Sequence, residues 1–371
     1  MHLHFESMSR PSAVDRRLDP EASLVPVPQA HRFDEAALAR YLRRHLQGLD
    51  GDLRVRQFHG GQSNPTFLVE SGGSRLVLRK KPPGALLPSA HQIEREFRVQ
   101  RALEGTGVPV PAQLLLCEDT TVIGTAFYLM AFVEGRIVRD LGDLGGALHA
   151  ARMYDALTAT LATLHAVDWQ RIGLSDFGRP EGFLARQLDR WGRQYRAAVV
   201  GTADPLVEPL MVWLSRKLPA ESTIGITHGD YRLGNLVFAP EAARVAAVLD
   251  WELCTIGDPL ADLAYLCIPY HVPPDLPGVM GLQGLDLAKL GVPDESALLA
   301  AYARHGGRDA APHWPFYKVF SFFRLAAIVQ GVFARGLKGN ASSDNAAGFE
   351  RLASLYLSIA WSLTRNEPPA G

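Results

Sequence analysis

The chain has 371 residues, of which 47% are hydrophobic and 21% charged, a composition typical of a globular protein with one large domain or two lobes. Its 38 lysine and arginine residues balance 39 aspartate and glutamate residues, so we expect neither nucleic acid nor an anionic membrane as a partner. No apolar run reaches the roughly 18 residues of a membrane span, and three cysteines without metal-ligand spacing favour buried thiols in a reduced, cytoplasmic setting.

The N-terminal residues do not resemble a structural element. We interpret residues 1–7 as a cloning remnant, with Met8 as the natural start. Residues 9–32 are polar and interrupted by prolines, which is typical of a loose segment. We therefore assign residues 1–32 to a leader that precedes the folded lobes.

The next hundred residues alternate between short strands and helices. A helix is predicted over residues 35–46, with Asp34 as its N-cap. Another helix is predicted from Ser89 to Leu103. The strand-like runs are separated by glycine-rich turns and other loop signals, and they cover residues 54–58, 66–69, 76–79, 114–117 and 127–133. The pattern predicts a small α+β lobe over residues 33–133.

Beyond residue 134 the pattern is mainly helical. Apolar spacing predicts helices around residues 153–164, 183–199 and 205–218. Three strands interrupt them, at residues 224–227, 236–238 and 245–249, and from residue 260 the pattern is helical again apart from a proline- and glycine-rich stretch over 269–293. We therefore expect residues 134–371 to form a larger helical lobe.

The segment HGDYRLGN, residues 228–235, places an aspartate and an asparagine five positions apart on the loop after a strand. A later apolar run ends at Asp250, so a hairpin can bring Asp230 and Asp250 together. Carboxylate and amide oxygens suit Mg²⁺, which shares its ligands with substrate phosphates. We expect Asn235 and Asp250 to bind the metal ion and Asp230 to accept a proton from an attacking hydroxyl. Alternatively, Asp250 and Asn235 only stabilise turns.

These motifs resemble the aminoglycoside/choline phosphotransferase family. The resemblance rests on His228-Gly229-Asp230 with Asn235, on Leu249-Asp250-Trp251-Glu252, and on Gly257-Asp258-Pro259. The runs at residues 78–84 and 87–91 are closest to the branch associated with acyl-CoA dehydrogenases, and the match covers roughly residues 35–362. It implies a two-lobed, protein-kinase-like α+β fold, with an antiparallel sheet in the small N-terminal lobe and a mainly helical C-terminal lobe.

The resemblance also implies an ATP site in the small lobe. The loop at residues 59–64 corresponds to the phosphate-covering loop, although it could also be a simple glycine turn. Arg79 stands where the family usually has a lysine that contacts the nucleotide phosphates, and Lys80 and Lys81 are the alternatives. Glu96 would brace that cation or lie on the helix surface. The predicted nucleotide-binding residues are Gly60, Gly61, Ser63, Asn64, Arg79, Glu96, Met130 and Phe132, and Met130 could equally be a core residue.

Several residues have two interpretations. His228 is better explained as a packed, hydrogen-bonded loop residue than as a proton carrier, and Asp258 and Asp262 are expected to brace the loop. Glu252 lies near the metal ligands or contacts substrate. A stripe of Arg186, Arg190 and Arg193 is either solvated or meets an anionic substrate, and Arg324 needs a buried carboxylate or a substrate group as a partner.

We therefore predict an ATP- and Mg²⁺-dependent O-phosphotransferase that acts on a hydroxylated small molecule. Basic residues outnumber acidic ones over residues 179–217, which favours a neutral or anionic acceptor, and the family branch suggests a hydroxyacyl-CoA and a functional link to an acyl-CoA dehydrogenase. Two alternatives remain at this point. One is an aminoglycoside phosphotransferase, and the other is a non-catalytic nucleotide-binding partner of a dehydrogenase.

Overall fold

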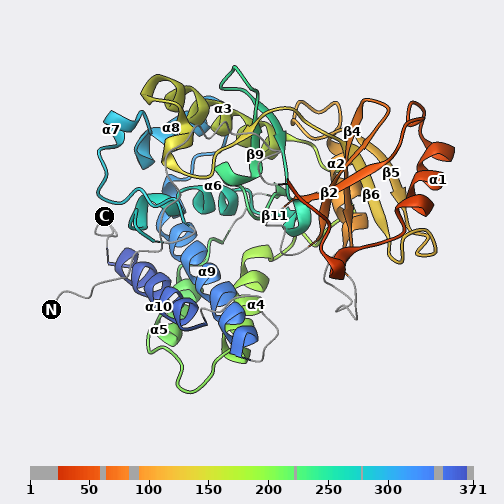
Figure 1. Ribbon diagram of the computed structural model, residues 1–371. Coiled ribbons are helices and arrows are strands. Elements are labelled where there is room, and N and C mark those ends of the chain that lie inside the picture. Colours follow the sequence, from red (N-terminus) through yellow and green to blue (C-terminus); the bar gives the residue numbers. More distant parts are fainter. Residues whose placement is uncertain are drawn as a thin grey trace.

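The computed structural model shows an α+β protein with two groups of elements, a sheet with two helices at one end and a larger helical assembly at the other (Figure 1). This arrangement agrees with the predicted small mixed lobe followed by a helical one. The structure describes residues 24–58, 64–82, 92–220, 224–276, 279–337 and 346–365.

The small lobe is built on a six-stranded antiparallel sheet in the order β1-β2-β3-β4-β6-β5. Glycines at positions 72 and 73, with φ of 58° and 83°, form the two-residue turn between β3 and β4. The strands are β1 (Leu24–Val25), β2 (Arg54–Phe58), β3 (Thr66–Ser71), β4 (Ser74–Lys80), β5 (Gln113–Cys117) and β6 (Phe127–Ala131). The predicted strands β2 to β6 are therefore present.

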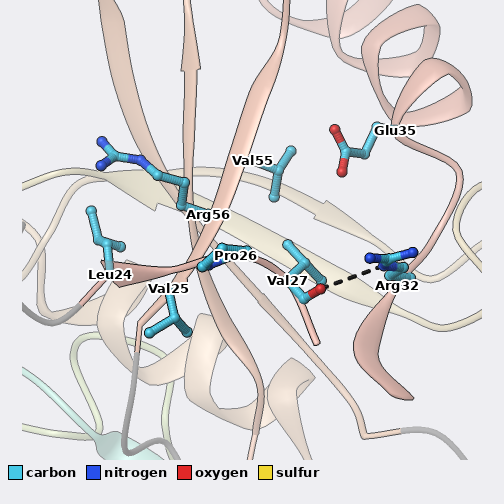
Figure 2. A pocket seen from close by; sticks show the side chains of 8 residues that line it. All are labelled: Leu24, Val25, Pro26, Val27, Arg32, Glu35, Val55 and Arg56. Carbon is cyan, nitrogen blue, oxygen red and sulfur yellow. Dashed lines mark hydrogen bonds between the residues drawn. The ribbon is translucent and has the colours of Figure 1, made fainter. Parts of the chain in front are cut away.

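The predicted loose leader differs from the structure in its last residues. Leu24 pairs with Phe58 and Val25 with Gln57, so β1 is the edge strand of the sheet. A strand of two residues has no alternating pattern that a sequence could reveal. A pocket of about 480 Å³ lies beside this edge and is lined by residues of β1, of β2 and of the segment that leads into α1. Figure 2 shows these side chains. Its lining residues include none of the predicted site residues.

The two faces of the sheet carry different helices. Helix α1 (Glu35–His45) begins at the predicted N-cap, where Asp34 accepts a hydrogen bond from the Ala37 N–H at 2.8 Å. It buries its apolar side on the face that includes Leu78. Helix α2 (Ile93–Leu103) covers the opposite face, which includes Val77. The predicted start of this helix at Ser89 lies outside the described residues.

The large lobe is organised around the long helix α9 (Trp314–Leu337), which packs against α4, α6 and α10. The apolar stretch Ala311–Leu337 is long enough to span a membrane by length and composition, contrary to the prediction, but 67% of its most apolar window is buried inside the protein. It is thus the core helix of this lobe. The other helices are α3 (Ala147–Ala166), α4 (Phe183–Ala197), α5 (Val207–Arg216), α6 (Leu260–Leu266), α7 (Leu287–Leu290), α8 (Glu295–Arg304) and α10 (Ala346–Leu363).

Two small sheets lie between the helical assembly and the small lobe, where Figure 1 labels β9 and β11. One has the order β10-β9-β7 and the other pairs β11 with β8. The predicted hairpin of β9 and β10 is present, whereas β7 and β11 were not predicted. The strands are β7 (Arg136–Ile137), β8 (Gly225–Thr227), β9 (Leu236–Phe238), β10 (Val245–Val248) and β11 (Thr255–Gly257). Their ends carry the motif residues.

Candidate active site

The loop that follows β8 is held in place by a buried carboxylate. Asp262, on α6, accepts hydrogen bonds from the N–H groups of His228 at 2.5 Å and Gly229 at 2.8 Å. Gly229 has a φ of +86°, and a Cβ at this position would lie 2.7 Å from the carbonyl oxygen of Leu253. Any larger residue would therefore distort the loop. The predicted bracing role of Asp262 agrees with this geometry.

His228 is fully buried. Its Nε2 lies 2.9 Å from the carbonyl oxygen of Leu249, and the Asp230 N–H donates to its Nδ1 at 3.2 Å. A ring that donates through one nitrogen and accepts through the other is neutral. The histidine thus connects two loops, which agrees with its interpretation as a packed loop residue.

Asn235 brings Asp230 and Asp250 together. Its side-chain NH₂ donates to the backbone oxygen of Asp230 at 2.8 Å and to the Asp230 carboxylate at 2.7 Å. The Leu249 N–H donates to the backbone oxygen of Asn235 at 2.8 Å, which places Asp250 beside this amide. Asp250 has a φ of 67° and is the one non-glycine residue with positive φ in the described part of the chain. Such a conformation is costly and typical of functional sites.

Arg79 joins the small lobe to this centre. Its Nε lies 3.0 Å from the Glu96 carboxylate, and its Nη2 lies 2.8 Å from Asp250 and 3.8 Å from Glu252. The Arg79 side chain is 12% exposed. The structure therefore brings the predicted phosphate-contacting cation, its helix glutamate and a predicted metal ligand into one cluster.

The two neighbouring lysines point elsewhere. Successive residues of a strand face opposite sides of the sheet, so Lys80 faces α1, where its Nζ lies 5.8 Å from the centre of the Phe33 ring. Lys81 pairs with Glu94 at 2.5 Å. Of these three cations, Arg79 is the one that contacts Glu96 and Asp250.

Glu96 is 1% exposed and has further partners. It accepts hydrogen bonds from the Asn64 side chain at 2.7 Å and from the Tyr128 hydroxyl at 3.1 Å. Burial raises the pKa of Glu96 to about 7, against the opposing effect of the Arg79 charge. Asn64 thus connects the predicted phosphate loop to α2. The other loop residues, Gly60, Gly61 and Ser63, lie outside the described residues.

The predicted adenine contacts lie in and just after β6. Met130 is 7% exposed and packs with Val77 and Ile93, so the core interpretation describes its surroundings. The Phe132 N–H donates to the backbone oxygen of Arg75 at 3.3 Å, and the Arg75 guanidinium lies 3.9 Å from the Phe132 ring centre. This N–H is therefore already engaged in the sheet.

The arginines of the predicted stripe on α4 make different contacts. Arg186 donates to the backbone oxygens of Arg179 and Glu181, and Arg193 pairs with Asp189 at 2.9 Å. By contrast, the guanidinium groups of Arg190 and Arg324 lie 5.1 and 5.5 Å from the Trp191 ring. Arg324 also donates to the backbone oxygen of Gly229 at 2.5 Å. Arg186, Arg190 and Arg193 are all exposed, which agrees with the solvated interpretation of the stripe, although different neighbours engage them. Contact with an anionic substrate stays a prediction.

Comparison with known proteins identifies the family. Residues 54–320 match the Phosphotransferase enzyme family (APH). The chain belongs to this family. A candidate aminoglycoside phosphotransferase from Ralstonia eutropha superposes with a TM-score of 0.81 at 42% identity, covering 90% of this chain and 99% of that one. Choline kinase from Cryptosporidium parvum, with a TM-score of 0.61 at 13% identity over 90% and 96% of the two chains, shares the kinase-like fold.

Curated relatives are longer. Acyl-CoA dehydrogenase family member 10 of Mus musculus is 44% identical over 92% of this chain, which spans 32% of that protein. Acyl-CoA dehydrogenase family member 11 of Homo sapiens is 43% identical over 90% of this chain, which spans 43% of that protein. The chain therefore spans less than half the length of these relatives. The predicted resemblance to the phosphotransferase family and its dehydrogenase-associated branch is confirmed.

One residue near this centre was not predicted. Tyr265 lies near Asp230, since burial first and then the Asp230 charge raise the pKa of the Tyr265 hydroxyl. Tyr265 lies three residues after Asp262 on α6, so both reach the same loop. The three-residue spacing from Asp262 was the signal in the sequence by which Tyr265 could have been found.

Asp258 was also predicted to brace the loop, but the partners of its carboxylate in the described part of the chain lie elsewhere. It accepts hydrogen bonds from the Leu260 N–H at 3.0 Å and the Tyr317 hydroxyl at 2.7 Å.

Proposed function

We propose that this chain is an ATP- and Mg²⁺-dependent O-phosphotransferase that acts on a hydroxylated small molecule. The observation that carries the proposal is the connected network of Asp230, Asn235, Asp250, Arg79 and Glu96 at the junction of the lobes. Family membership supports phosphoryl transfer. The AMP-PNP complex of an aminoglycoside phosphotransferase with the same fold is consistent with ATP as donor.

In this proposal Asp230 is the general base. The acceptor hydroxyl gives its proton to the Asp230 carboxylate while its oxygen bonds to the γ-phosphorus of ATP, and the bond between that phosphorus and the bridging oxygen breaks to release ADP. The side-chain amide of Asn235, which donates to the Asp230 carboxylate at 2.7 Å, holds that carboxylate in one orientation. Arg79, held by Glu96, contacts the nucleotide phosphates.

The chemistry of the donor groups suits a magnesium ion. Asn235 uses its NH₂ on Asp230, which leaves its side-chain carbonyl oxygen for a cation. Asp250 offers carboxylate oxygens, and it follows Leu249, whose N–H donates to the backbone oxygen of Asn235. The described ranges hold no cluster of three His, Cys, Asp or Glu side chains that could bind a metal by themselves. A magnesium ion usually completes its ligands with water and substrate phosphates. When bound, such an ion neutralises the charge that develops on the phosphates.

For the acceptor we propose a hydroxyacyl-CoA. The curated relatives carry the name acyl-CoA dehydrogenase, which favours a functional link to such an enzyme over antibiotic modification, and the basic helix α4 does not suit a polycation. We further propose that the protein acts in the cytoplasm. A phosphotransferase specific for aminoglycosides is the competing hypothesis, supported by similar solved structures.

The substitution Asp230→Asn tests the assignment. The amide has the same shape but cannot accept the proton, so kcat should fall at least about 100-fold, while AMP-PNP affinity and the thermal unfolding temperature stay close to the wild type. The assay uses ATP with a panel of hydroxyacyl-CoA esters, hydroxy acids and aminoglycosides. Full kcat in the variant would contradict the base assignment, and nucleotide binding without turnover in the wild type would favour a non-catalytic module.

A further inference from the structure

Two arginines where α4 meets α9 have no carboxylate partner in the part of the chain that the structure describes. Arg190 on α4 and Arg324 on α9 lie over the Trp191 ring, and within the described ranges neither makes an ion pair. Trp191 is 6% exposed. Its indole nitrogen and the Arg324 Nε are buried, and neither has a hydrogen-bond partner in the described part of the chain. Buried donors of this kind normally find acceptors.

Arg190 is exposed, and two other exposed arginines further along α4 have carboxylate partners. Arg193 pairs with Asp189 at 2.9 Å, and Arg196 pairs with Glu208 at 2.8 Å. Burial and the nearby Arg324 charge lower the pKa of Arg190. The unpaired positive charge is thus concentrated where α4 meets α9, and an anion there would relieve both the repulsion and the unmet donors.

Arg324 contacts the loop that carries the proposed base, Asp230. Arg324 donates to the backbone oxygen of Gly229 at 2.5 Å, and its guanidinium lies 5.3 Å from the centre of the Tyr265 ring. Next after burial, the Asp230 charge raises the pKa of that tyrosine, so its hydroxyl lies near the Asp230 carboxylate. One tyrosine side chain therefore separates Arg324 from the carboxylate that would receive the acceptor proton.

We propose that Arg190, Trp191, Tyr265 and Arg324, here named the arginine cluster, form a subsite for an anionic group of the acceptor. The inference rests on the proposed function and specifies its substrate class as a hydroxylated molecule that carries a carboxylate or phosphate. Guanidinium groups bind both anions through paired hydrogen bonds. The same charge disfavours polycationic acceptors.

The test compares acceptors that share one hydroxyl. A 4-hydroxy carboxylic acid, its methyl ester and its coenzyme A ester are assayed with wild type, Arg190→Gln and Arg193→Gln. Arg190→Gln should raise KM for the anionic acceptor about tenfold or more relative to KM for the methyl ester, with KM for ATP and the unfolding temperature unchanged. Arg193→Gln, on the same helix but paired with Asp189, should not change this ratio.

The acceptors also distinguish the source of the anion. A shift with the free acid identifies a carboxylate, and a shift with the coenzyme A ester alone identifies the phosphates. A second variant, Arg324→Lys, is assayed in the same way. If both variants keep turnover and the wild-type ratio of KM for the anionic acceptor to KM for the methyl ester, the subsite is overturned and the proposed function stands. If the wild type phosphorylates none of the three, the proposed function fails, and calorimetric titration with the free acid decides the subsite: equal affinity in wild type and Arg190→Gln overturns it.

Discussion

Arg79 makes contacts that a lysine at the same position could not make together. Its planar guanidinium places Nε on Glu96 and Nη2 on Asp250, 3.0 and 2.8 Å away, and so bridges a small-lobe helix to the loop after β10. A lysine carries one charged atom, which would reach one of these carboxylates at a time. The cation of this site therefore also orients Asp250.

We predict that Arg79→Gln lowers kcat/KM for ATP about 10- to 100-fold, since a charge-assisted contact to phosphate is lost. Arg79→Lys should retain an intermediate value, because the charge remains and the bridge does not. Steady-state kinetics with varied ATP measures both. Lys81→Gln is the matched control, since Lys81 pairs with Glu94 away from this site, and wild-type kinetics are expected for it. A larger loss in Lys81→Gln than in Arg79→Gln would contradict the assignment.

At the scale of elements, α8 is fastened to its neighbours by one carboxylate. Glu295 lies 2.7 Å from His271, 3.0 Å from Lys318 and 2.5 Å from the Trp314 indole nitrogen. Burial alone would raise the pKa of Glu295, but the contacts with His271 and Trp314 and the Lys318 charge lower it to about 2. The ionised form is thus favoured by folding.

The sign of the pH dependence follows from this pKa. Because the folded pKa lies below the unfolded value of about 4.3, the contribution of Glu295 is complete above that pH and is lost as pH falls toward 2. We predict that Glu295→Gln lowers the free energy of unfolding at pH 7, and that its difference from wild type shrinks between pH 5 and pH 3. Urea unfolding over this range measures it. Glu118→Gln, at an exposed position, should behave as wild type at every pH, and a constant difference for Glu295→Gln would contradict the assignment.

At the scale of the whole molecule, the site is made by both lobes. Arg79 and Glu96 come from the small lobe, whereas Asp230, Asn235 and Asp250 come from the loops of the small sheets in the large lobe. A nucleotide that contacts both sets binds only the folded, assembled chain. Binding should therefore stabilise the protein as a unit.

We predict that AMP-PNP with Mg²⁺ raises the thermal unfolding temperature. At a concentration about 100 times its Kd, the stabilisation is about 2.7 kcal/mol, equivalent to a few degrees for a protein of this size. Differential scanning fluorimetry measures the shift. AMP at the same concentration is the control, and Arg79→Gln should reduce the shift for AMP-PNP. No shift with AMP-PNP or with a GTP analogue would argue against a nucleotide site.

Most helices and longer strands, and the residues of the centre, could be predicted from the order of residues along the chain. Asp230 and Asn235 are close because five positions separate them, and the β9–β10 hairpin returns the chain to Asp250. The N-cap Asp34 was predictable for the same reason, since it contacts the backbone three residues away. Interactions of this kind depend on local spacing, which the chain carries in its order of residues.

Tertiary structure alone decided which of several equivalent residues reach the site. Arg79, Lys80 and Lys81 are alike in sequence, and the side of the sheet that meets α2 selects Arg79. The packing of α4 against α9 likewise separates Arg190 from Arg186 and Arg193, and the pairing of β1 with β2 orders residues of the predicted leader. Each outcome depends on contacts between segments that are distant along the chain. The free energy of those contacts depends on how the whole core packs, so it cannot be read from local sequence patterns.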